Sequence, residues 1–295
     1  MIDSVVAQTA GDWELVIVDN GMSDEVVRIV EKYADDPRIR LLRQEYQGTP
    51  GGINAAAAAA RGAYYAVLAS DGRLEPAFCE RIAAVLDEHP EIDVLCIDAL
   101  PFLDGIDRPP SFRQRCGITD EPGVEHRTGL AEAIRRPALY STAAIRASAW
   151  NAAGGYPGDT PQVESLAMCL RMLAAGCDLR VLPEQLGGYN LDQPPADEDE
   201  YDAGVERAFL QVTTLTDDPE VLAALRSTLR EHRYNRALRL SRKALRNSDP
   251  VTARQQAWLA LRQRPSVRPA VMWALLRVAP GLLHRLKAVK RRITG

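Results

Sequence analysis

The chain has 295 residues, 46% of them hydrophobic, with 36 Lys and Arg against 40 Asp and Glu and a formal net charge of −4 at pH 7. This length and apolar content exclude a disordered chain and are typical of one large α/β domain or of a domain with an appendage. No window approaches the roughly 18 apolar residues of a membrane-spanning helix. Because the N-terminus also lacks the layout of a signal peptide, we expect a cytoplasmic protein.

The charges are unevenly distributed along the chain. Residues 226–295 hold 18 Lys and Arg and two acids, Glu231 and Asp249, whereas residues 1–225 hold 18 basic and 38 acidic residues. An acidic body with a basic C-terminal part predicts that one end meets a polyanion, such as an anionic lipid surface, nucleic acid or the acidic face of a partner.

The five cysteines are scattered without CxxC spacing. We therefore expect small buried cysteines rather than a zinc site or disulfides.

Short apolar strands alternate with helices over the first 71 residues. After what looks like the end of an amphipathic helix at 1–9, the pattern predicts strands at 13–19, 39–43 and 64–69, helices at 23–33 and 54–60, and a loop at 48–52. This alternation is typical of a doubly wound, mostly parallel sheet.

The third strand is followed at once by a carboxylate, Asp71. Strands that are buried on both faces read as continuous apolar runs, and ligands bind beyond the carboxyl ends of such strands. Asp71 is therefore a candidate ligand-binding residue. Ser70, Asp71 and Gly72 also suit a simple turn that leads into a helix beginning near Pro76, and this alternative stays open.

The remainder of the chain predicts a mixed region, a linker and a helical C-terminal part. A helix at 76–88 and a strand at 92–98 precede an irregular excursion at 103–136, a length that is usually functional or mobile. Further elements are expected at 139–145 (strand), 147–153 (helix), 164–175 (helix) and 179–182 (brief strand).

The acidic, proline-led stretch 194–203 is predicted to be a linker between a domain at 1–193 and a helical basic region at 204–295. Within that region the expected helices are 204–215, 219–246, 251–263, 267–278 and 281–292.

Four segments, taken together and in order, resemble the family 2 glycosyltransferases, which are nucleotide-sugar-dependent enzymes of the GT-A fold. They are residues 4–9 followed by 13–21; Arg43 and Gln44 followed by Gly48 and Asn54; 60–62 leading into 67–71; and Gly154, Gly155 and Tyr156 followed by Glu164, Leu170 and Arg171. The resemblance covers about residues 1–190. It implies a GT-A-like, doubly wound sheet whose first strand is missing, so we expect the true start to lie upstream.

The resemblance also implies a nucleotide-sugar site made of Asp19, Asn20, Asn54, Ser70 and Asp71. Asp19, with Asn20 beside it, matches the acid at a strand end that contacts the base or ribose. Ser70 and Asp71 fall on the Asp-x-Asp element, whose last acid holds Mg²⁺ or Mn²⁺ against the diphosphate. One carboxylate can suffice, because Mg²⁺ commonly keeps several waters and takes its other ligands from the substrate phosphates.

Several positions depart from the family pattern. The first acid of the metal element is replaced by Ala69, and Gly72 follows Asp71. Where the family carries a Glu-Asp pair with the catalytic base, this chain has Glu164 and Ser165, and the later acid is Ala167. A serine cannot accept the acceptor's proton near neutral pH, which leaves Glu164 as the candidate base. Glu164 is equally explained as an acid in the first turn of a helix, where the dipole favours it.

Two functional hypotheses follow from these patterns. The first is an inverting glycosyltransferase that moves a sugar from a nucleoside diphosphate sugar to a glycan or lipid-linked hydroxyl, with residues 103–136 on the acceptor side. The second is a catalytically inactive relative that serves as a binding or scaffold protein at a membrane surface. Residues 226–295 either attach the protein peripherally to the anionic inner face of the membrane or dock on its acidic body. Nucleic-acid binding is the third interpretation of residues 226–295. It ranks last because no recognisable nucleic-acid module accompanies the charge.

Overall fold

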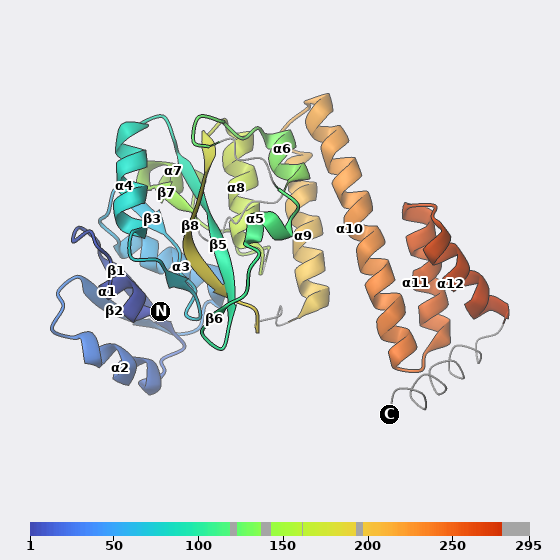
Figure 1. Cartoon of the computed structure of the whole chain (residues 1–295), viewed down its shortest axis with the longest axis horizontal. Coiled ribbons are helices and arrows are strands. Elements are labelled where there is room, and N and C mark those ends of the chain that lie inside the picture. Colours follow the sequence, from blue (N-terminus) through green and yellow to red (C-terminus); the bar gives the residue numbers. More distant parts are fainter. Residues whose placement is uncertain (119–122, 137–142, 161, 193–196, 279–295) are drawn as a thin grey trace. The chain divides into compact units, whose positions relative to one another are not determined.

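The computed structural model describes residues 1–118, 123–136, 143–160, 162–192 and 197–278. The chain divides into two compact units, Met1–Leu222 and Ala223–Gly295. This division falls later in the sequence than the predicted linker at 194–203. Figure 1 shows the elements of both units in chain order.

The first unit begins with a small parallel sheet. Strand β1 (Leu15–Asn20) pairs in parallel with β2 (Ile39–Gln44), and these two strands form a sheet of their own. The register sets Asp19 opposite Arg43 and Asn20 opposite Gln44. The neighbouring helices are α1 (Ile2–Val6), α2 (Asp24–Val30) with a 3₁₀ turn at Glu31–Tyr33, and α3 (Gly48–Ala59).

A second, six-stranded sheet forms the centre of this unit. In spatial order it runs β3 (Tyr64–Ala66), β7 (Ala144–Arg146), β5 (Val94–Leu103), β8 (Leu179–Asn190) and β4 (Arg73–Leu74), and β6 (Ile106–Asp107) pairs with β5. The α/β fold class is confirmed, but the strand directions are more mixed than the sequence predicts. Strands β5 and β8 are parallel, whereas the other pairs in this sheet are antiparallel.

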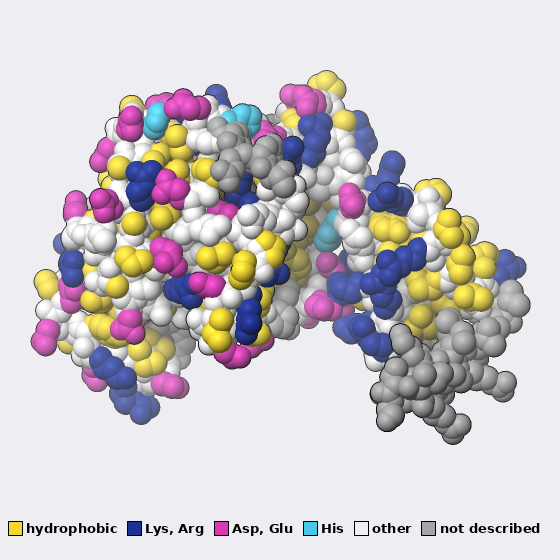
Figure 2. All heavy atoms as spheres, viewed as in Figure 1, with side chains coloured by type: hydrophobic (Ala, Val, Ile, Leu, Met, Phe, Trp, Pro, Cys, Tyr) yellow, Lys and Arg dark blue, Asp and Glu magenta, His cyan; other side chains and the backbone are white. Residues whose placement is uncertain are grey.

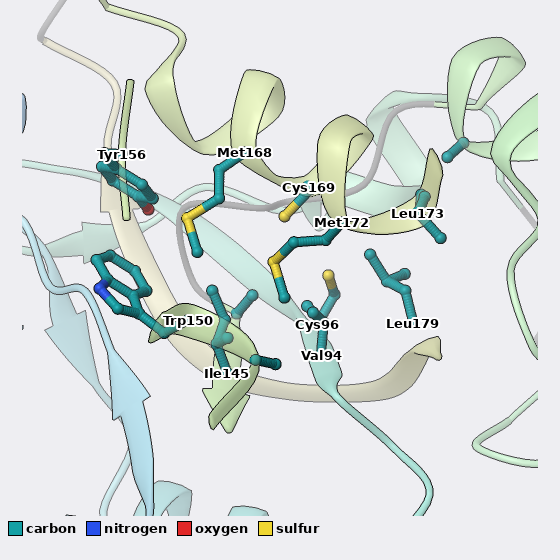
Figure 3. Packing of buried hydrophobic residues seen from close by; sticks show 13 residues of the cluster. Val94, Cys96, Ile145, Trp150, Tyr156, Met168, Cys169, Met172, Leu173 and Leu179 are labelled. Atoms are coloured by element: carbon teal, nitrogen blue, oxygen red, sulfur yellow. The ribbon is translucent and has the colours of Figure 1, made fainter. Parts of the chain in front are cut away.

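Helices cover both faces of β5. They include α4 (Phe78–Glu88), α7 (Ala147–Ala153) and α8 (Glu164–Ala174), and the unit also contains α5 (Phe112–Arg115), α6 (Leu130–Arg135) and α9 (Glu198–Val212). Because successive side chains of a strand point to opposite faces, Val94 and Cys96 pack with α7 and α8, whereas Leu95 and Ile97 pack with α4. Figure 3 shows the first of these clusters, where sulfur-bearing side chains of α8 lie over β5.

The cysteines follow the prediction only in part. Cys96 and Cys169 are fully buried in the cluster under α8, whereas Cys116 is exposed. Burial raises the pKa of the Cys96 thiol to about 12, so this group remains protonated near neutral pH.

The strand that leads to Asp71 differs most from its prediction. Residues 64–69 were expected to form a buried parallel strand, but β3 ends at Ala66, lies at the edge of the sheet and pairs with β7 in the antiparallel direction. Ala66 is exposed, so the strand is not covered on both faces. Asp71 instead lies in a turn, where Gly72 N donates to Ala69 O at 2.9 Å. The local structure is therefore a turn, and the role of Asp71 as a ligand-binding residue stays a prediction.

Three further predictions need correction. The expected loop 48–52 forms the first turns of α3, where Pro50 is tolerated because the N–H groups of a first turn have no intrahelical partner. Residues 198–203, expected in the linker, begin α9, because Asp197 caps it by accepting from Asp199 N and Glu200 N. Strand β8 is much longer than 179–182, since its pairing with β5 continues past an irregularity at Asp98.

The irregular excursion at 103–136 contains β6, α5 and α6. The strand expected from 139 is described only from residue 143, and the helix expected at 281–292 lies outside the described residues.

The second unit is helical, as predicted. It holds most of α10 (Pro219–Arg246), together with α11 (Pro250–Gln263) and α12 (Val267–Val278). Asp249 caps α11 by accepting from Thr252 N at 3.0 Å. Its core is made of small and medium apolar side chains, among them Ala237, Leu238, Ala260, Met272 and Leu276. Among the described residues of the whole chain, no helix is long and apolar enough to cross a membrane.

Candidate functional site

Asp71 is held in the turn between β3 and β4. Its side chain is half-buried, and within the described ranges its carboxylate makes no hydrogen bond or ion pair. Gly72 next to it is buried, and a Cβ there would lie 3.0 Å from Leu68 Cδ1 and 3.3 Å from Ala69 O. A side chain at position 72 would therefore press on Leu68 and on the backbone of the turn. Ser70, on the other side of Asp71, is exposed.

The segment that follows Asp71 is anchored by Gln8 and Thr9. Gln8 Nε2 donates to Glu75 O at 2.8 Å, and Gln8 Oε1 accepts from Cys79 N at 2.8 Å. Thr9 N donates to Pro76 O at 2.9 Å. These bonds tie α1 and the residues after it to the start of α4. The Gln8 and Thr9 pair therefore helps to fix the chain immediately after the turn.

Asp19 is buried at the end of β1, with 3% of its surface exposed. Its Oδ1 accepts from Ser23 N at 2.9 Å, and its Oδ2 accepts from Arg43 Nε at 3.0 Å. Arg43 also reaches Asp24 at 3.3 Å. A buried carboxylate with two partners keeps the loop after β1 and the end of β2 in one arrangement.

Asn20 is equally occupied by its neighbours. Its Nδ2 donates to Gly48 O at 2.8 Å, and its Oδ1 accepts from Gln44 Nε2 at 2.8 Å and from Gln47 N at 3.1 Å. Gly52 lies so close that a Cβ there would be 3.2 Å from Asn20 Nδ2. Asn20 therefore joins the ends of β1 and β2 to the first turns of α3.

Asn54 of α3 contacts a loop that is distant in sequence. Its Nδ2 donates to Tyr156 O and its Oδ1 accepts from Tyr156 N, both at 2.9 Å. Gly155 has a φ of +73°, and Arg171 Nη2 donates to Gly155 O at 2.9 Å. The structure thus brings together Asn54, from the second of the four segments that carry the family resemblance, and residues of the fourth segment.

Glu164 is the first residue of α8 and has 7% of its surface exposed. Its Oε1 accepts from Gln162 N at 3.1 Å. Tyr156 is buried close to it: burial, with smaller contributions from the charges of Cys169 and Glu164, raises the pKa of the Tyr156 hydroxyl well above its usual value. Ala167, where the family has a further acid, is 1% exposed and belongs to the core.

A divalent cation can be tested against these residues. Within the ranges that the structure describes, no group of three His, Cys, Asp or Glu side chains could hold a metal ion. The unpaired carboxylate of Asp71 nevertheless fits a Mg²⁺ or Mn²⁺ ion that takes its other ligands from water and from substrate phosphates. Asp71 is the residue that would hold it.

Asp98 is a buried acid that the sequence analysis did not select. It lies at the irregularity of β5, is 4% exposed, and its Oδ1 accepts from Ala99 N at 2.9 Å and from Arg113 N at 3.1 Å. Asp98 thereby attaches α5, in the excursion at 103–136, to the central sheet. The signal was present, because an acid that interrupts an apolar strand needs a buried partner.

Comparisons with known proteins agree with this fold and these motifs. Residues 1–141 match the family described as Glycosyl transferase family 2. This range includes Asp19, Asn20, Asn54, Ser70 and Asp71, and Glu164 lies beyond it.

Two relatives illustrate the sequence similarity. The chain is 35% identical over 98 residues to the chondroitin synthase of Escherichia coli, a stretch that covers 32% of this chain and 14% of the relative. It is 34% identical over 102 residues to a PGL/p-HBAD biosynthesis glycosyltransferase of Mycobacterium bovis, with 34% of this chain and 40% of the relative covered. The chain therefore spans well under half the length of these relatives.

Solved structures share the fold over almost the whole chain. S. aureus TarS 1–349 in complex with UDP-GlcNAc has a TM-score of 0.63 at 18% identity, covering 98% of this chain and 82% of that chain. The mannosyltransferase PcManGT from Pyrobaculum calidifontis, in complex with GDP-Man and Mn²⁺, has a TM-score of 0.59 at 16% identity, covering 95% and 75%. These neighbours confirm a fold of the GT-A type. Over residues 1–141, slightly under half of its length, the chain is thus similar to glycosyl transferase family 2, and its fold is that of the solved glycosyltransferases.

Proposed function

We propose that this protein transfers a sugar from a nucleoside diphosphate sugar to a hydroxyl group. The observation that carries the proposal is Asp71, whose half-buried carboxylate is unpaired within the described ranges and lies in the segment that matches the family. The proteins of similar fold support the choice of donor, since they are described in complex with UDP, UDP-GlcNAc and GDP-Man.

On the donor side, Asp71 would hold Mg²⁺ or Mn²⁺, with Ser70 next to it in the same turn. Such a cation neutralises the charge that develops on the departing diphosphate. Asp19 and Asn20 would form the wall that receives the nucleotide, because their hydrogen bonds hold the ends of β1 and β2 and the start of α3 in place. Asn54 would complete this part of the site from α3.

On the acceptor side, Glu164 is the proposed base. The acceptor oxygen would form a bond to the anomeric carbon while the bond to the diphosphate breaks, and the hydroxyl proton would pass to the Glu164 carboxylate. Direct displacement of this kind inverts the configuration at the anomeric carbon. We propose a glycan or a lipid-linked hydroxyl as acceptor, as in polysaccharide biosynthesis, with the excursion at 103–136 on the acceptor side.

The proposed location follows from the charge distribution. Residues 226–295 carry 18 Lys and Arg against two acids, and we place the protein peripherally on the anionic inner face of a membrane through this basic part. Nucleic acid is a less favoured partner, because no nucleic-acid module accompanies the charge.

A second candidate is supported by the degenerate motifs. Ala69, Ser165 and Ala167 replace acids of the family pattern, which favours an inactive relative that binds or scaffolds other components at the membrane. The two candidates differ in one measurable property, the turnover of donor.

The deciding experiment is hydrolysis and binding of UDP- and GDP-linked sugars by the full chain, with and without Mn²⁺. Asp71→Asn should lower turnover by at least the roughly tenfold that loss of an outer-shell metal partner costs. Asp35→Asn, which changes an exposed carboxylate of the same unit, is the matched control and should behave like the wild type. If no donor is bound or hydrolysed, or if Asp71→Asn acts like its control, the inactive relative is the better description.

A further inference from the structure

Helices α11 and α12 carry six large apolar side chains that are exposed. The exposed large hydrophobic side chains there are Val251 (55% exposed), Trp258 (44%), Leu259 (43%), Val267 (78%), Val271 (50%) and Leu275 (38%). We call these six residues the outer apolar face. Val267, Val271 and Leu275 are spaced by four residues, so they lie on one side of α12.

This face does not form the core of the unit. The opposite side of α12 already supplies core residues, since Leu276 is 2% exposed and packs with Ala253, while Met272 packs in both clusters of this unit. On α11 the core side is formed by Ala253, Ala257 and Ala260, all fully buried. Helix α12 therefore has apolar residues both toward the core and toward the outside.

Aromatic rings also join α11 and α12. The ring centroids of Trp258 and Trp273 are 5.3 Å apart, and the guanidinium carbon of Arg277 lies 5.3 Å from the Trp273 ring. Figure 2 shows hydrophobic side chains gathered over α11 and α12 with Lys and Arg beside them. Tryptophan next to basic side chains is the composition that proteins use at the boundary between lipid and water.

The surrounding charge is almost entirely positive. The described part of the second unit carries exposed or half-exposed arginines on both helices, namely Arg254, Arg262, Arg264, Arg268 and Arg277. Glu231 and Asp249 are its acids, and Asp249 is engaged in capping α11. A second copy of this face would meet like charge, which opposes self-association, whereas an anionic surface is complementary to it.

We propose that the outer apolar face of α11 and α12 inserts into an anionic lipid surface, with the arginines beside it meeting the headgroups. Interfacial helices bind in this way, by burying an apolar side below the headgroups while basic residues remain at their level. The inference extends the proposed membrane location by assigning the contact to particular side chains. It rests on the proposed function only in placing a lipid-linked acceptor at the same surface.

The test compares two double variants of the full chain. Val271→Ser with Leu275→Ser removes two side chains of the outer apolar face without changing charge. Leu210→Ser with Leu215→Ser is the matched control, because these leucines of the first unit are 43% and 45% exposed. Binding to phosphatidylcholine vesicles, with and without phosphatidylglycerol, is measured by co-sedimentation.

Wild type and control should bind the anionic vesicles equally, and the α12 variant should bind about tenfold more weakly. Tryptophan emission of the wild type should shift to shorter wavelength with these vesicles, as Trp258 leaves water.

Three results would overturn the inference. Binding that survives in the α12 variant but is lost in Arg262→Gln with Arg268→Gln would mean adsorption by charge alone. A dimer in light scattering that the α12 variant dissociates would identify a second copy as the occupant. Retention of an oligonucleotide that depends on Val271 and Leu275 would identify nucleic acid.

Donor hydrolysis without vesicles separates this inference from the proposed function. The α12 variant should turn over donor like the wild type, because its changes lie outside the donor site. A wild type that hydrolyses no donor but still binds anionic vesicles through Val271 and Leu275 would refute only the proposed function.

Discussion

Asn54 holds both backbone polar groups of Tyr156, with Nδ2 donating to the carbonyl oxygen and Oδ1 accepting from the N–H, each at 2.9 Å. The two residues are 102 positions apart in sequence. Their contact joins α3 to the loop between α7 and α8, and therefore to the segment that leads to Glu164. Because the Asn54 amide makes both of these hydrogen bonds, we expect the residue to position this loop.

The Asn54 contact should be measurable as stability. Asn54→Ala leaves the N–H and C=O of Tyr156 without these partners, and an unmade buried hydrogen bond costs about 1–3 kcal/mol. We expect the free energy of unfolding in urea to fall by about that amount. Asn235→Ala, at an exposed position of α10, should change it little. Equal unfolding of both variants would show that the contact has no net stabilising role.

The adjacent glycines provide a matched pair. Gly154 and Gly155 have φ values of +74° and +73°, but a Cβ at Gly154 meets nothing within 4 Å, whereas one at Gly155 would lie 2.4 Å from Asn54 Oδ1. Gly154→Ala should cost only the backbone strain of about 1–2 kcal/mol. Gly155→Ala should cost clearly more in the same urea titration, because it also displaces Asn54. Equal losses would contradict the close approach of Asn54 to this loop.

The two acidic partners of Arg43 differ in how deeply they are buried. The Asp19 side chain is 2% exposed and the Asp24 side chain 89% exposed. Asp19→Asn removes the buried negative charge and replaces one acceptor oxygen by an NH2 group, which cannot accept a hydrogen bond from the Arg43 guanidinium. We expect the unfolding free energy to fall by about 2 kcal/mol or more. Asp24→Asn should change it by less than about 0.5 kcal/mol, because surface ion pairs contribute little. Comparable losses would argue against the buried Asp19 contact as the main one.

Glu14 predicts a dependence of stability on pH. Partial burial raises the pKa of Glu14, but hydrogen bonds from Arg61 N, the Arg40 side chain and Gly62 N outweigh it, so the pKa is lowered from the ordinary 4.5. A carboxyl with a lowered pKa in the folded state stabilises the fold above the unfolded value and loses that contribution as pH falls through the folded value. The contribution should therefore be present above pH 4.5 and disappear below it.

Glu14→Gln tests this expectation through urea unfolding at neutral pH and at the lowest pH where the wild type stays folded. The variant should be less stable than the wild type at neutral pH, and the difference should shrink in acid. Glu45→Gln, at an exposed position, should follow the wild type throughout. A difference between Glu14→Gln and wild type that does not depend on pH would contradict the role of the Glu14 charge.

The sequence by itself determined the features that depend on near neighbours. The helices at 219–246 and 267–278 have the predicted bounds, because Asp-Pro and Arg-Pro breaks and helical periodicity act over a few residues. The resemblance to the family also pointed to Asp71 as a candidate site residue. The turn that holds Asp71 was one of the two local structures that the sequence predicted.

Only the tertiary structure decided which distant segments meet. The antiparallel pairing of β3 at the sheet edge, the extension of β8 past Asp98, and the contact of Asn54 with Tyr156 all join residues far apart in sequence. The exposure of Val271 and Trp258 likewise depends on which side of each helix the core has already taken. Hydrophobicity shows that such a residue can be buried, but the packing of the other helices determines whether it is.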